Sequence, residues 1–157
     1  GRTLPGFIGD ISYAQSNRER YEGFCQALAD AGKKVDSSLC LTTPLGIDTY
    51  REEIDTFLSS LSRMPDAFVC ASDYVACILM QLLEKRGLRV PEDVAVSGFD
   101  NNTEDLLAEH LTTVQVFNEE LGARLALQIL YRIKYPNTPH EITYLGTNVL
   151  YRDSTGD

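Results

Sequence analysis

This sequence of 157 residues has no long apolar run, few histidines, and no two cysteines at metal-binding spacing. No apolar run approaches the roughly 20 residues that a membrane-spanning helix needs, so we expect no membrane segment. The four cysteines contain no C-x-x-C pair, and with only two histidines the chain offers no ligand set at zinc-binding spacing. We therefore expect no metal, and four reduced thiols in the core of a cytoplasmic protein: Cys25, Cys40, Cys70 and Cys77.

Positive charge is also in short supply, since 14 lysines and arginines face 23 acidic residues and leave a formal net charge of -9. An acidic chain gains nothing from neutralising phosphates, so we do not expect it to bind nucleic acid by itself. Residues 1–6 lack the charged and then apolar build of a signal peptide. With 43% hydrophobic and 24% charged residues, the composition is typical of one folded soluble domain.

Catalytic motifs are missing as well. The sequence has no G-x-S-x-G elbow, no P-loop and no H-E-x-x-H motif. Gly6 and Gly9 do not form a dinucleotide fingerprint, because no third glycine opens the following helix. The two histidines, His110 and His140, fall in expected loops, away from the strand ends where a general base would be useful. We therefore expect neither enzymatic activity nor a cofactor.

Strand and helix patterns alternate along the chain. Short apolar segments predict strands at 4–8, 39–41, 67–71, 94–97 and 112–116, with late edge strands at 141–144 and 147–151. Apolar residues at helical spacing predict helices that end at Gly32 and Gly87, one over 50–61 with Asp48 as N-cap, and a long one over 118–133. This order predicts an α/β fold: a doubly wound, mostly parallel sheet with helices on both faces.

Doubly wound sheets bind ligands beyond the carboxyl ends of their strands, which here are followed by residues 10–16, 42–47, 72–73 and 98–102. Asp100 can accept hydrogen bonds from neighbouring hydroxyls, and Arg20 can reach over the same crevice with its fork of donors. Ser72 and Asp73 would cap the helix that starts at Tyr74. Taken alone, each residue also has an ordinary explanation, as a turn carboxylate, a solvated arginine or a helix cap.

The stretch PDAFVCASDYVACILMQLLEKRGLRVPEDVAVSGFDN, which begins at Pro65, resembles the lactose-repressor-type (LacI/GalR) family of bacterial transcription regulators. That family shows a P-D-A-x-x-x-x-N-D segment, a helix that ends in R-G, and then V-P-x-D-x-x-V-x-G-[FY]-D. Further matches flank the stretch: Arg20-x-x-Gly23-Phe24, then Leu111 to Val114, and the closing Tyr151 to Thr155. The resemblance therefore spans nearly the whole chain.

The resemblance implies a periplasmic-binding-protein-like effector domain of two lobes, of which this chain is the C-terminal portion. Residues 1–113 and 145–157 would lie mainly in the C-terminal lobe, and 116–140 would return to the N-terminal lobe. The helix-turn-helix head would lie before Gly1, absent from this chain, and operator DNA would be bound only through that head. The implied assembly is a homodimer, whose contacts we expect on the helix 74–86 and the loop 103–109.

By the same resemblance, Arg20 and Asp100 match family residues that hydrogen-bond the effector. Ser72 stands where the family usually has an asparagine ligand, and with Asp73 of the same motif it completes the predicted effector-binding set. The implied effector is a sugar or related small metabolite that binds between the lobes and controls DNA binding allosterically. A periplasmic-type solute-binding protein, which shares the two-lobed architecture, is the alternative.

Overall fold

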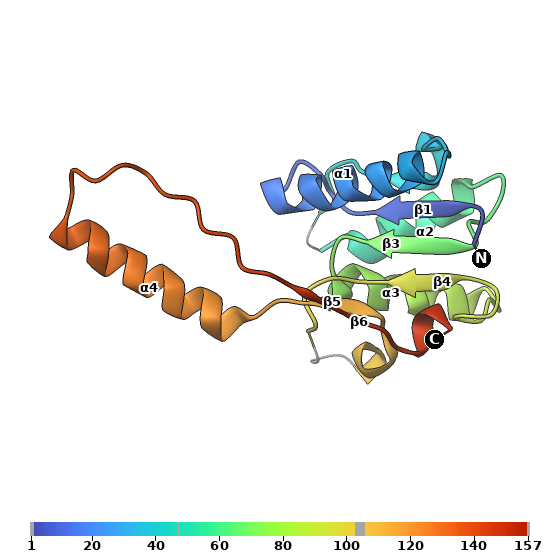
Figure 1. Ribbon diagram of the computed structural model, residues 1–157. Coiled ribbons are helices and arrows are strands. Elements are labelled where there is room, and N and C mark those ends of the chain that lie inside the picture. The colour runs from blue at the N-terminus through green and yellow to red at the C-terminus, as the bar shows by residue number, and fades with distance from the viewer. Residues whose placement is uncertain (1, 47, 103–105, 157) are drawn as a thin grey trace.

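The computed structural model of the protein describes residues 2–46, 48–102 and 106–156. Its central sheet has four short parallel strands: β1 (Pro5–Ile8), β2 (Cys40–Leu41), β3 (Ala67–Cys70) and β4 (Ala95–Ser97). The strands lie in the order β2-β1-β3-β4, and β1, β3 and β4 are labelled in Figure 1. Because the chain moves outward from β1 to β2 and then crosses back to β3, the strand order reverses beside β1. The predicted doubly wound, mostly parallel sheet is confirmed.

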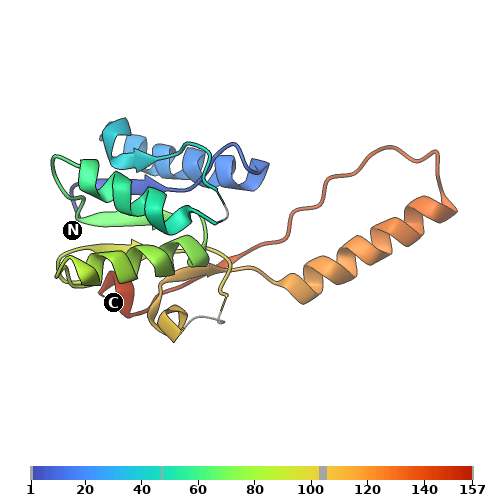
Figure 2. The same cartoon turned by 180° about the vertical axis from the view of Figure 1, so that it is seen from behind.

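Helices cover both faces of this sheet, as predicted (Figures 1 and 2). The first helix, α1 (Gln15–Asp30), lies on one face. The next two, α2 (Tyr50–Ser60) and α3 (Asp73–Lys85), lie side by side on the other face. This arrangement leaves the loops after each strand at one edge of the sheet, where strands end and helices begin.

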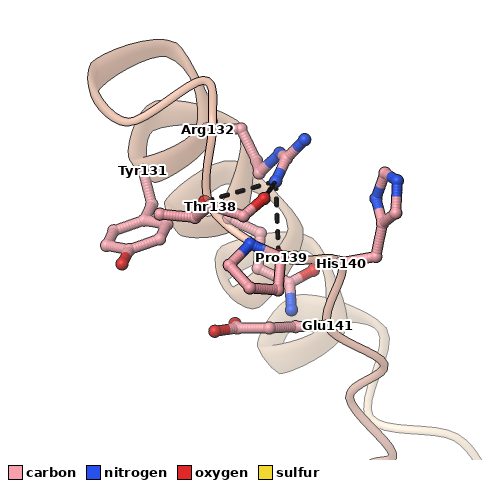
Figure 3. A pocket seen from close by; sticks show the side chains of 7 residues that line it. Tyr131, Arg132, Thr138, Pro139, His140 and Glu141 are labelled. Atoms are coloured by element: carbon pink, nitrogen blue, oxygen red, sulfur yellow. Dashed lines mark hydrogen bonds between the residues drawn. The ribbon is translucent and has the colours of Figure 1, made fainter.

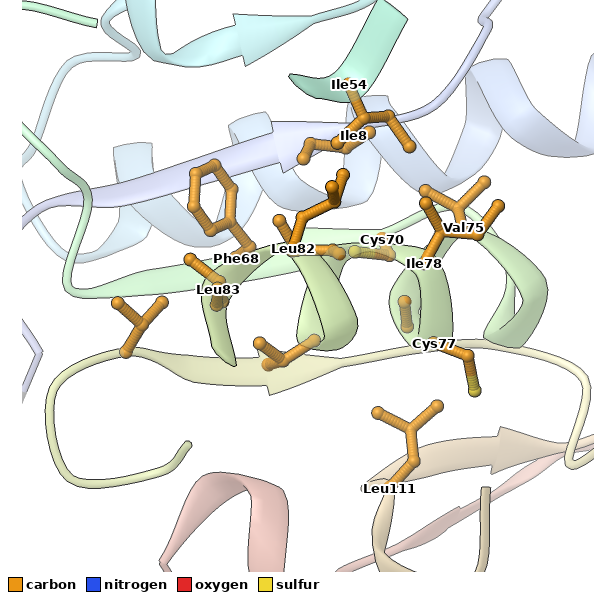
Figure 4. Packing of buried hydrophobic residues seen from close by; sticks show 14 of the residues in the cluster. Ile8, Ile54, Phe68, Cys70, Val75, Cys77, Ile78, Leu82, Leu83 and Leu111 are labelled. Atoms are coloured by element: carbon orange, nitrogen blue, oxygen red, sulfur yellow. The ribbon is translucent and has the colours of Figure 1, made fainter. Parts of the chain in front are cut away.

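The core has two parts, one on each face of the sheet. On the α1 face, Phe7 of β1 packs against Phe24. On the other face, Ile8 and Phe68 meet the apolar sides of α2 and α3 (Figure 4). Neighbouring strand residues point to opposite faces, which is why Phe7 and Ile8 belong to different clusters. Most of α3 is buried, including Val75, Ala76, Cys77, Ile78, Leu79, Leu82 and Leu83.

Helix ends follow the sequence signals at most positions. Gly32 has a φ of +69°, a left-handed conformation that a glycine adopts without a Cβ clash. Ser72 caps α3, because its hydroxyl oxygen accepts the Val75 amide proton at 3.3 Å. The predicted N-cap Asp48 is wrong, since α2 begins one residue later than such a cap requires and Thr49 holds that position.

A two-stranded ribbon extends the sheet beyond β4. It consists of β5 (Thr113–Gln115) and β6 (Asn148–Leu150), which pair antiparallel. Parallel bridges join Ser97 to Thr112 and Asp100 to β5, so the ribbon continues the open edge of β4. The strands predicted at 112–116 and 147–151 are confirmed, each shorter by one residue at either end.

The end of the chain is fastened to the sheet by a buried serine. Ser154 accepts the Thr112 amide proton at 2.8 Å and donates its hydroxyl to the Val96 carbonyl at 2.6 Å. It lies in the short helical turn η3 (Asp153–Thr155); the described residues also form the turns η1 (Ser37–Leu39) and η2 (Leu106–His110). The C-terminal turn therefore belongs to the same packed lobe as the sheet.

An arm projects from this lobe, formed by α4 (Asn118–Lys134) and the return segment 135–147 (Figures 1 and 2). None of the residues of α4 is buried. Between 45% and 72% of each large apolar side chain stays exposed: Leu121, Leu125, Leu127, Ile129, Leu130, Tyr131 and Ile133. The strand predicted at 141–144 is wrong, because this segment runs along the arm and pairs with no strand in the described part of the chain. Within the described ranges, no helix combines the length and the apolar character that crossing a lipid bilayer requires.

Candidate functional site

Two predicted site residues, Arg20 and Asp100, meet at the carboxyl edge of the sheet. Arg20 Nη2 lies 3.4 Å from Asp100 Oδ1, and Arg20 Nη1 donates to the Ala71 carbonyl just after β3. The Arg20 side chain is 19% exposed and that of Asp100 is 42% exposed. One residue comes from α1 and the other follows β4, 80 positions apart, so only the fold brings them together.

Phe99 supports the arginine of this pair. Arg20 Cζ lies 3.7 Å from the centre of the Phe99 ring, a distance at which the ring face attracts the guanidinium. This contact restricts the positions that the guanidinium can take. Sequence reasoning missed this role, although the position of Phe99 directly before Asp100 was a signal that could have shown it.

Burial opposes the charges of both partners. It lowers the pKa of the Arg20 guanidinium and raises the pKa of the Asp100 carboxyl, because each group loses water that would solvate its charge. The attraction between the two opposes both shifts without reversing either. The neighbouring carboxylate of Asp73 adds to the shift at Asp100. At 3.4 Å the contact is long for an ion pair, and ligand hydroxyls that bond to both groups would improve the solvation of each.

The backbone at Asp100 is strained. Asp100 has a φ of +113° and Asn101 a φ of +54°, conformations that residues with a side chain rarely adopt. Two contacts hold them there: the Asp100 amide donates to the Val114 carbonyl at 3.0 Å, and Arg152 Nη2 donates to Asn101 Oδ1 at 2.8 Å. Strained residues of this kind concentrate at binding sites, where the surrounding structure fixes them.

Ser72 lies beside the pair, because it follows the Ala71 carbonyl that binds Arg20. Its oxygen accepts the amide proton that caps α3, so its own hydroxyl proton is left for donation. The structure therefore brings Arg20, Ser72 and Asp100 to one edge of the sheet.

Asp73 occupies a different position from the other three predicted residues. Only 3% of it is exposed, and its carboxylate accepts the Asn102 amide proton at 2.7 Å and the Thr113 hydroxyl proton at 2.5 Å. Burial raises the pKa of Asp73, and these hydrogen bonds partly offset that rise. A Cβ at Gly98 would lie 2.2 Å from Asp73 Oδ1, so only glycine fits there. Asp73 thus fastens the loop that carries Asp100 to β5.

Asp10 joins the remaining two loops at this edge. It is 6% exposed, and its carboxylate accepts amide protons from Ser12 at 2.7 Å, Tyr13 at 3.1 Å and Leu45 at 3.3 Å. Burial alone would raise the pKa of Asp10, but these hydrogen bonds and that of the Ser12 hydroxyl lower it. Asp10 therefore links the loop after β1 to the loop after β2.

A hollow of about 390 Å³ opens beside Arg20 and runs along the ends of β3 and β4 toward the ribbon. Its lining is mostly apolar: Val69, Cys70, Ser97, Gly98, Phe99, Thr112, Thr113, Val114, Val149, Tyr151 and Thr155 surround the arginine. The candidate site is thus an open edge with a loosely paired arginine and aspartate. Within the described ranges, histidines, cysteines and carboxylates nowhere gather in threes that could hold a metal ion.

Residues 1–155 match a family described as the periplasmic binding protein-like domain. The chain belongs to this family. This periplasmic-binding-protein-like chain is 35% identical over 117 residues to the transcriptional regulator DegA of Bacillus subtilis, a match that covers 74% of the chain and 34% of DegA. It is 29% identical over 159 residues to the transcriptional repressor PurR of Photobacterium profundum, a match that covers 100% of the chain and 47% of that repressor.

Solved structures give the same result for the fold. The periplasmic-binding-protein-like chain superposes on a complex of the transcriptional regulator CelR with cellobiose with a TM-score of 0.87 and 29% identity, over 98% of this chain and 47% of CelR. These relatives are named as transcriptional regulators and not as enzymes, which confirms the resemblance to LacI/GalR-type regulators. The chain spans about half the length of such relatives, or less.

A second hollow of this domain, of about 190 Å³, lies on the arm between α4 and the return segment (Figure 3). Arg132 donates there to the Thr138 carbonyl at 2.5 Å and to the Pro139 carbonyl at 3.3 Å. His140 and Glu141 line the same hollow. The guanidinium is used to fold the return segment back onto α4, and the predicted site residues lie elsewhere, at the edge of the sheet.

Proposed function

We propose that this chain is the ligand-sensing part of a LacI-type transcriptional regulator. It binds a small effector, a sugar or related metabolite, at the carboxyl edge of its sheet and carries out no reaction. The observation that carries the proposal is the 3.4 Å contact between Arg20 and Asp100 at that edge, where 19% of the Arg20 side chain and 42% of the Asp100 side chain are exposed. An arginine donates and an aspartate accepts, so together they match neighbouring hydroxyls of a polyol.

In this proposal, three of the predicted residues contact the effector and the fourth holds the loop that carries one of them. Arg20, Ser72 and Asp100 contact the effector, and Asp73 is a positioning residue that holds the Asp100 loop against β5. Ser72 offers one hydroxyl where an asparagine would offer an amide, so this corner of the site has room for a larger ligand group or a water.

The arm completes a second lobe in this proposal. Residues 1–113 and 145–157 form the C-terminal lobe, and 116–140 pack into the N-terminal lobe. Full burial of one exposed leucine or isoleucine stabilises a protein by roughly 1.5–3 kcal/mol, so the seven exposed apolar residues of α4 favour a partner surface in the whole protein. The effector then binds between the lobes and favours one relative angle of the two.

The output is control of operator DNA through a helix-turn-helix head outside this chain, in a cytoplasmic homodimer. We place the dimer contacts on the exposed side of α3 and on the loop 103–109, of which 103–105 lie outside the described residues. A solute-binding protein for transport shares the two lobes, but the curated relatives are named as transcriptional regulators, which favours the regulator.

The test is an Asp100→Ala variant of the full-length protein. A thermal-shift screen of sugars, sugar phosphates and purines identifies the effector of the wild type, because a bound ligand raises the unfolding temperature. Loss of two hydrogen bonds to a charged group weakens effector binding about 100-fold or more, as measured by calorimetry.

Asp55→Ala is the matched control. Asp55 is also about half exposed and lies 2.6 Å from an arginine, Arg86, but between α2 and α3, away from the candidate site. It should bind the effector as the wild type does. An Asp100→Ala protein that is folded and keeps full affinity would contradict the proposed function.

A further inference from the structure

Three tyrosines stand along the carboxyl edge of the sheet, one after each of three strands. Tyr13 lies in the loop after β1, Tyr50 is the first residue of α2, and Tyr74 is the second residue of α3. Large parts of two of them are exposed, 73% of Tyr13 and 59% of Tyr74. Because these loops share one edge with Ser72 and Asp100, the tyrosines form a rim beside the candidate site.

The rim is held in place by the fold. The half-buried Tyr50 packs on the cluster below α2 and α3, and its ring meets that of Tyr74 edge to face, with centres 5.7 Å apart at 87°. Asp10 accepts the Tyr13 amide proton and the Leu45 amide proton, which ties the loop of Tyr13 to the loop that precedes Tyr50. Ring faces that are fixed before binding lose little conformational entropy when a ligand arrives.

A fixed, exposed aromatic face suits one kind of ligand surface in particular. The flat side of a pyranose ring carries C–H groups, which pack on the electron-rich face of an aromatic ring, while its edge carries hydroxyls. Tyrosine adds a phenol that can bond to those hydroxyls. Tyr74 is separated from Ser72 by one residue at the start of α3, so the tyrosine pair and the candidate site lie at the same edge of the sheet.

Charge limits the ligand further. Arg20 is matched by Asp100, and Asp73 adds a negative charge behind them. Arg152 is bound to Asn101 and to the Ala108 and Leu111 carbonyls. An added phosphate or carboxylate beside Asp100 would face this negative surplus, and both of these arginines already have partners.

The rim itself is also acidic. Asp10 and Glu53 raise the pKa of the Tyr50 phenol, after burial, which contributes most to that rise. The phenol therefore stays protonated and available as a donor at neutral pH.

We infer that the effector is an uncharged oligosaccharide whose first ring bonds to Arg20, Ser72 and Asp100 and whose second ring lies against Tyr74 and Tyr50. The inference rests on the proposed function, which needs only the first ring. It adds a second subsite and excludes phosphorylated sugars as the main effector.

Calorimetry on the full-length protein tests the inference. The probes are cellobiose, maltose, lactose and sucrose, their component monosaccharides, and glucose 6-phosphate. We expect one disaccharide to bind about tenfold or more tightly than its monosaccharides and than the phosphate, the size of one good aromatic contact. In Tyr74→Leu, which keeps bulk without a ring, this ratio should fall to about threefold or less, and in Tyr74→Phe it should persist.

A second measurement needs no variant. Saturation of the aromatic protons of the wild-type protein should transfer to both rings of the bound disaccharide in NMR. A monosaccharide or the phosphate as tightest ligand, an unchanged ratio in folded Tyr74→Leu, or transfer to one ring alone would overturn the inference. The inference would also be overturned if Tyr74→Leu associated with itself more weakly in sedimentation and kept the wild-type ratio of disaccharide to monosaccharide affinity. The rim would then be a contact between copies of the chain.

None of these results contradicts the proposed function if Asp100→Ala weakens the binding of whichever metabolite the wild type binds. If no member of the panel binds, the oligosaccharide inference is overturned. The Asp100→Ala comparison with the metabolite found in the thermal-shift screen then decides the proposed function separately.

Discussion

The helices α3 and α4 have the same kind of apolar sequence pattern, but α3 is buried and α4 is exposed. Both have apolar residues at helical spacing, yet eight residues of α3 are buried, whereas none of α4 is. The difference is that α3 follows a strand of the parallel sheet and packs on it directly, while α4 leaves the ribbon and runs away from the lobe (Figure 1). An apolar stripe therefore identifies which side of a helix will pack, and leaves its partner to the rest of the protein.

The largest contrast between the two helices should appear when one leucine is truncated in each. Leu79 of α3 is 0% exposed, so Leu79→Ala should lower the free energy of unfolding of the 157-residue chain by about 2–5 kcal/mol. Leu125 of α4 is 56% exposed, and Leu125→Ala should change it by less than about 0.5 kcal/mol. Urea denaturation measures both. Equal losses in the two variants would show that α4 is packed in this chain.

A smaller contrast is expected between a carboxylate of the lobe and one of the arm. Asp10 has a lowered pKa, so its contribution to stability is present above the ordinary aspartate pKa of about 4 and is lost as the pH falls through the folded value. Asp10→Asn should therefore cost about 1–2 kcal/mol at pH 7, and the difference from the wild type should shrink at pH 3.

Glu120→Gln on α4 is the counterpart for that comparison. Glu120 pairs with Arg124 one turn away, and both side chains are more than half exposed, so its removal should cost about 0.3–0.5 kcal/mol. Urea denaturation of both variants at the two pH values gives the result. A cost for Asp10→Asn that is the same at pH 7 and pH 3 would contradict the role given to its charge.

The smallest contrast concerns two glycines, whose substitution by alanine should change the stability in opposite directions. Gly87 ends α3 with a φ of +72°, so Gly87→Ala should lower the stability by about 1 kcal/mol. Gly122 lies inside α4 with open space around its Cβ position, so Gly122→Ala should raise the stability by about 0.5–1 kcal/mol. Thermal unfolding should show a lower midpoint for the first variant and a higher one for the second. A loss in both would indicate that α4 is packed closely at Gly122.

Local signals predicted most of the lobe. The apolar strands, the stop at Gly32 and the Ser72 cap depend on a few neighbouring residues each, and the structure contains all of them. The failures are also local: Asp48 lies one position too early to cap α2, and the segment 141–144 has strand-forming residues but no strand beside it in the described part of the chain. Strand propensity needs a pairing partner, which a single segment does not reveal.

The candidate site depended on contacts that local patterns cannot show. The strand ends point to Asp100 and Arg20, and the resemblance assigns both to the effector, but their contact joins residues 80 positions apart. Asp73 has the residue type of a ligand-binding group, and only the hydrogen bonds from Asn102 and Thr113 reveal it as a buried support. Phe99 and the tyrosine rim were missed because aromatic residues beside apolar strands are usually read as core.

The hydrogen bond from Asp100 to β5 has a mechanical consequence. The strand runs into α4 after only Val116 and Phe117, and the Asp100 amide is bonded to the Val114 carbonyl. A displacement of α4 along β5 would therefore be passed to Asp100 through this one backbone hydrogen bond, without a flexible side chain between the two. In the proposed function, the residue that contacts the effector is therefore bonded directly to the strand that leads into α4, so effector binding at the carboxylate would also act on the position of the arm.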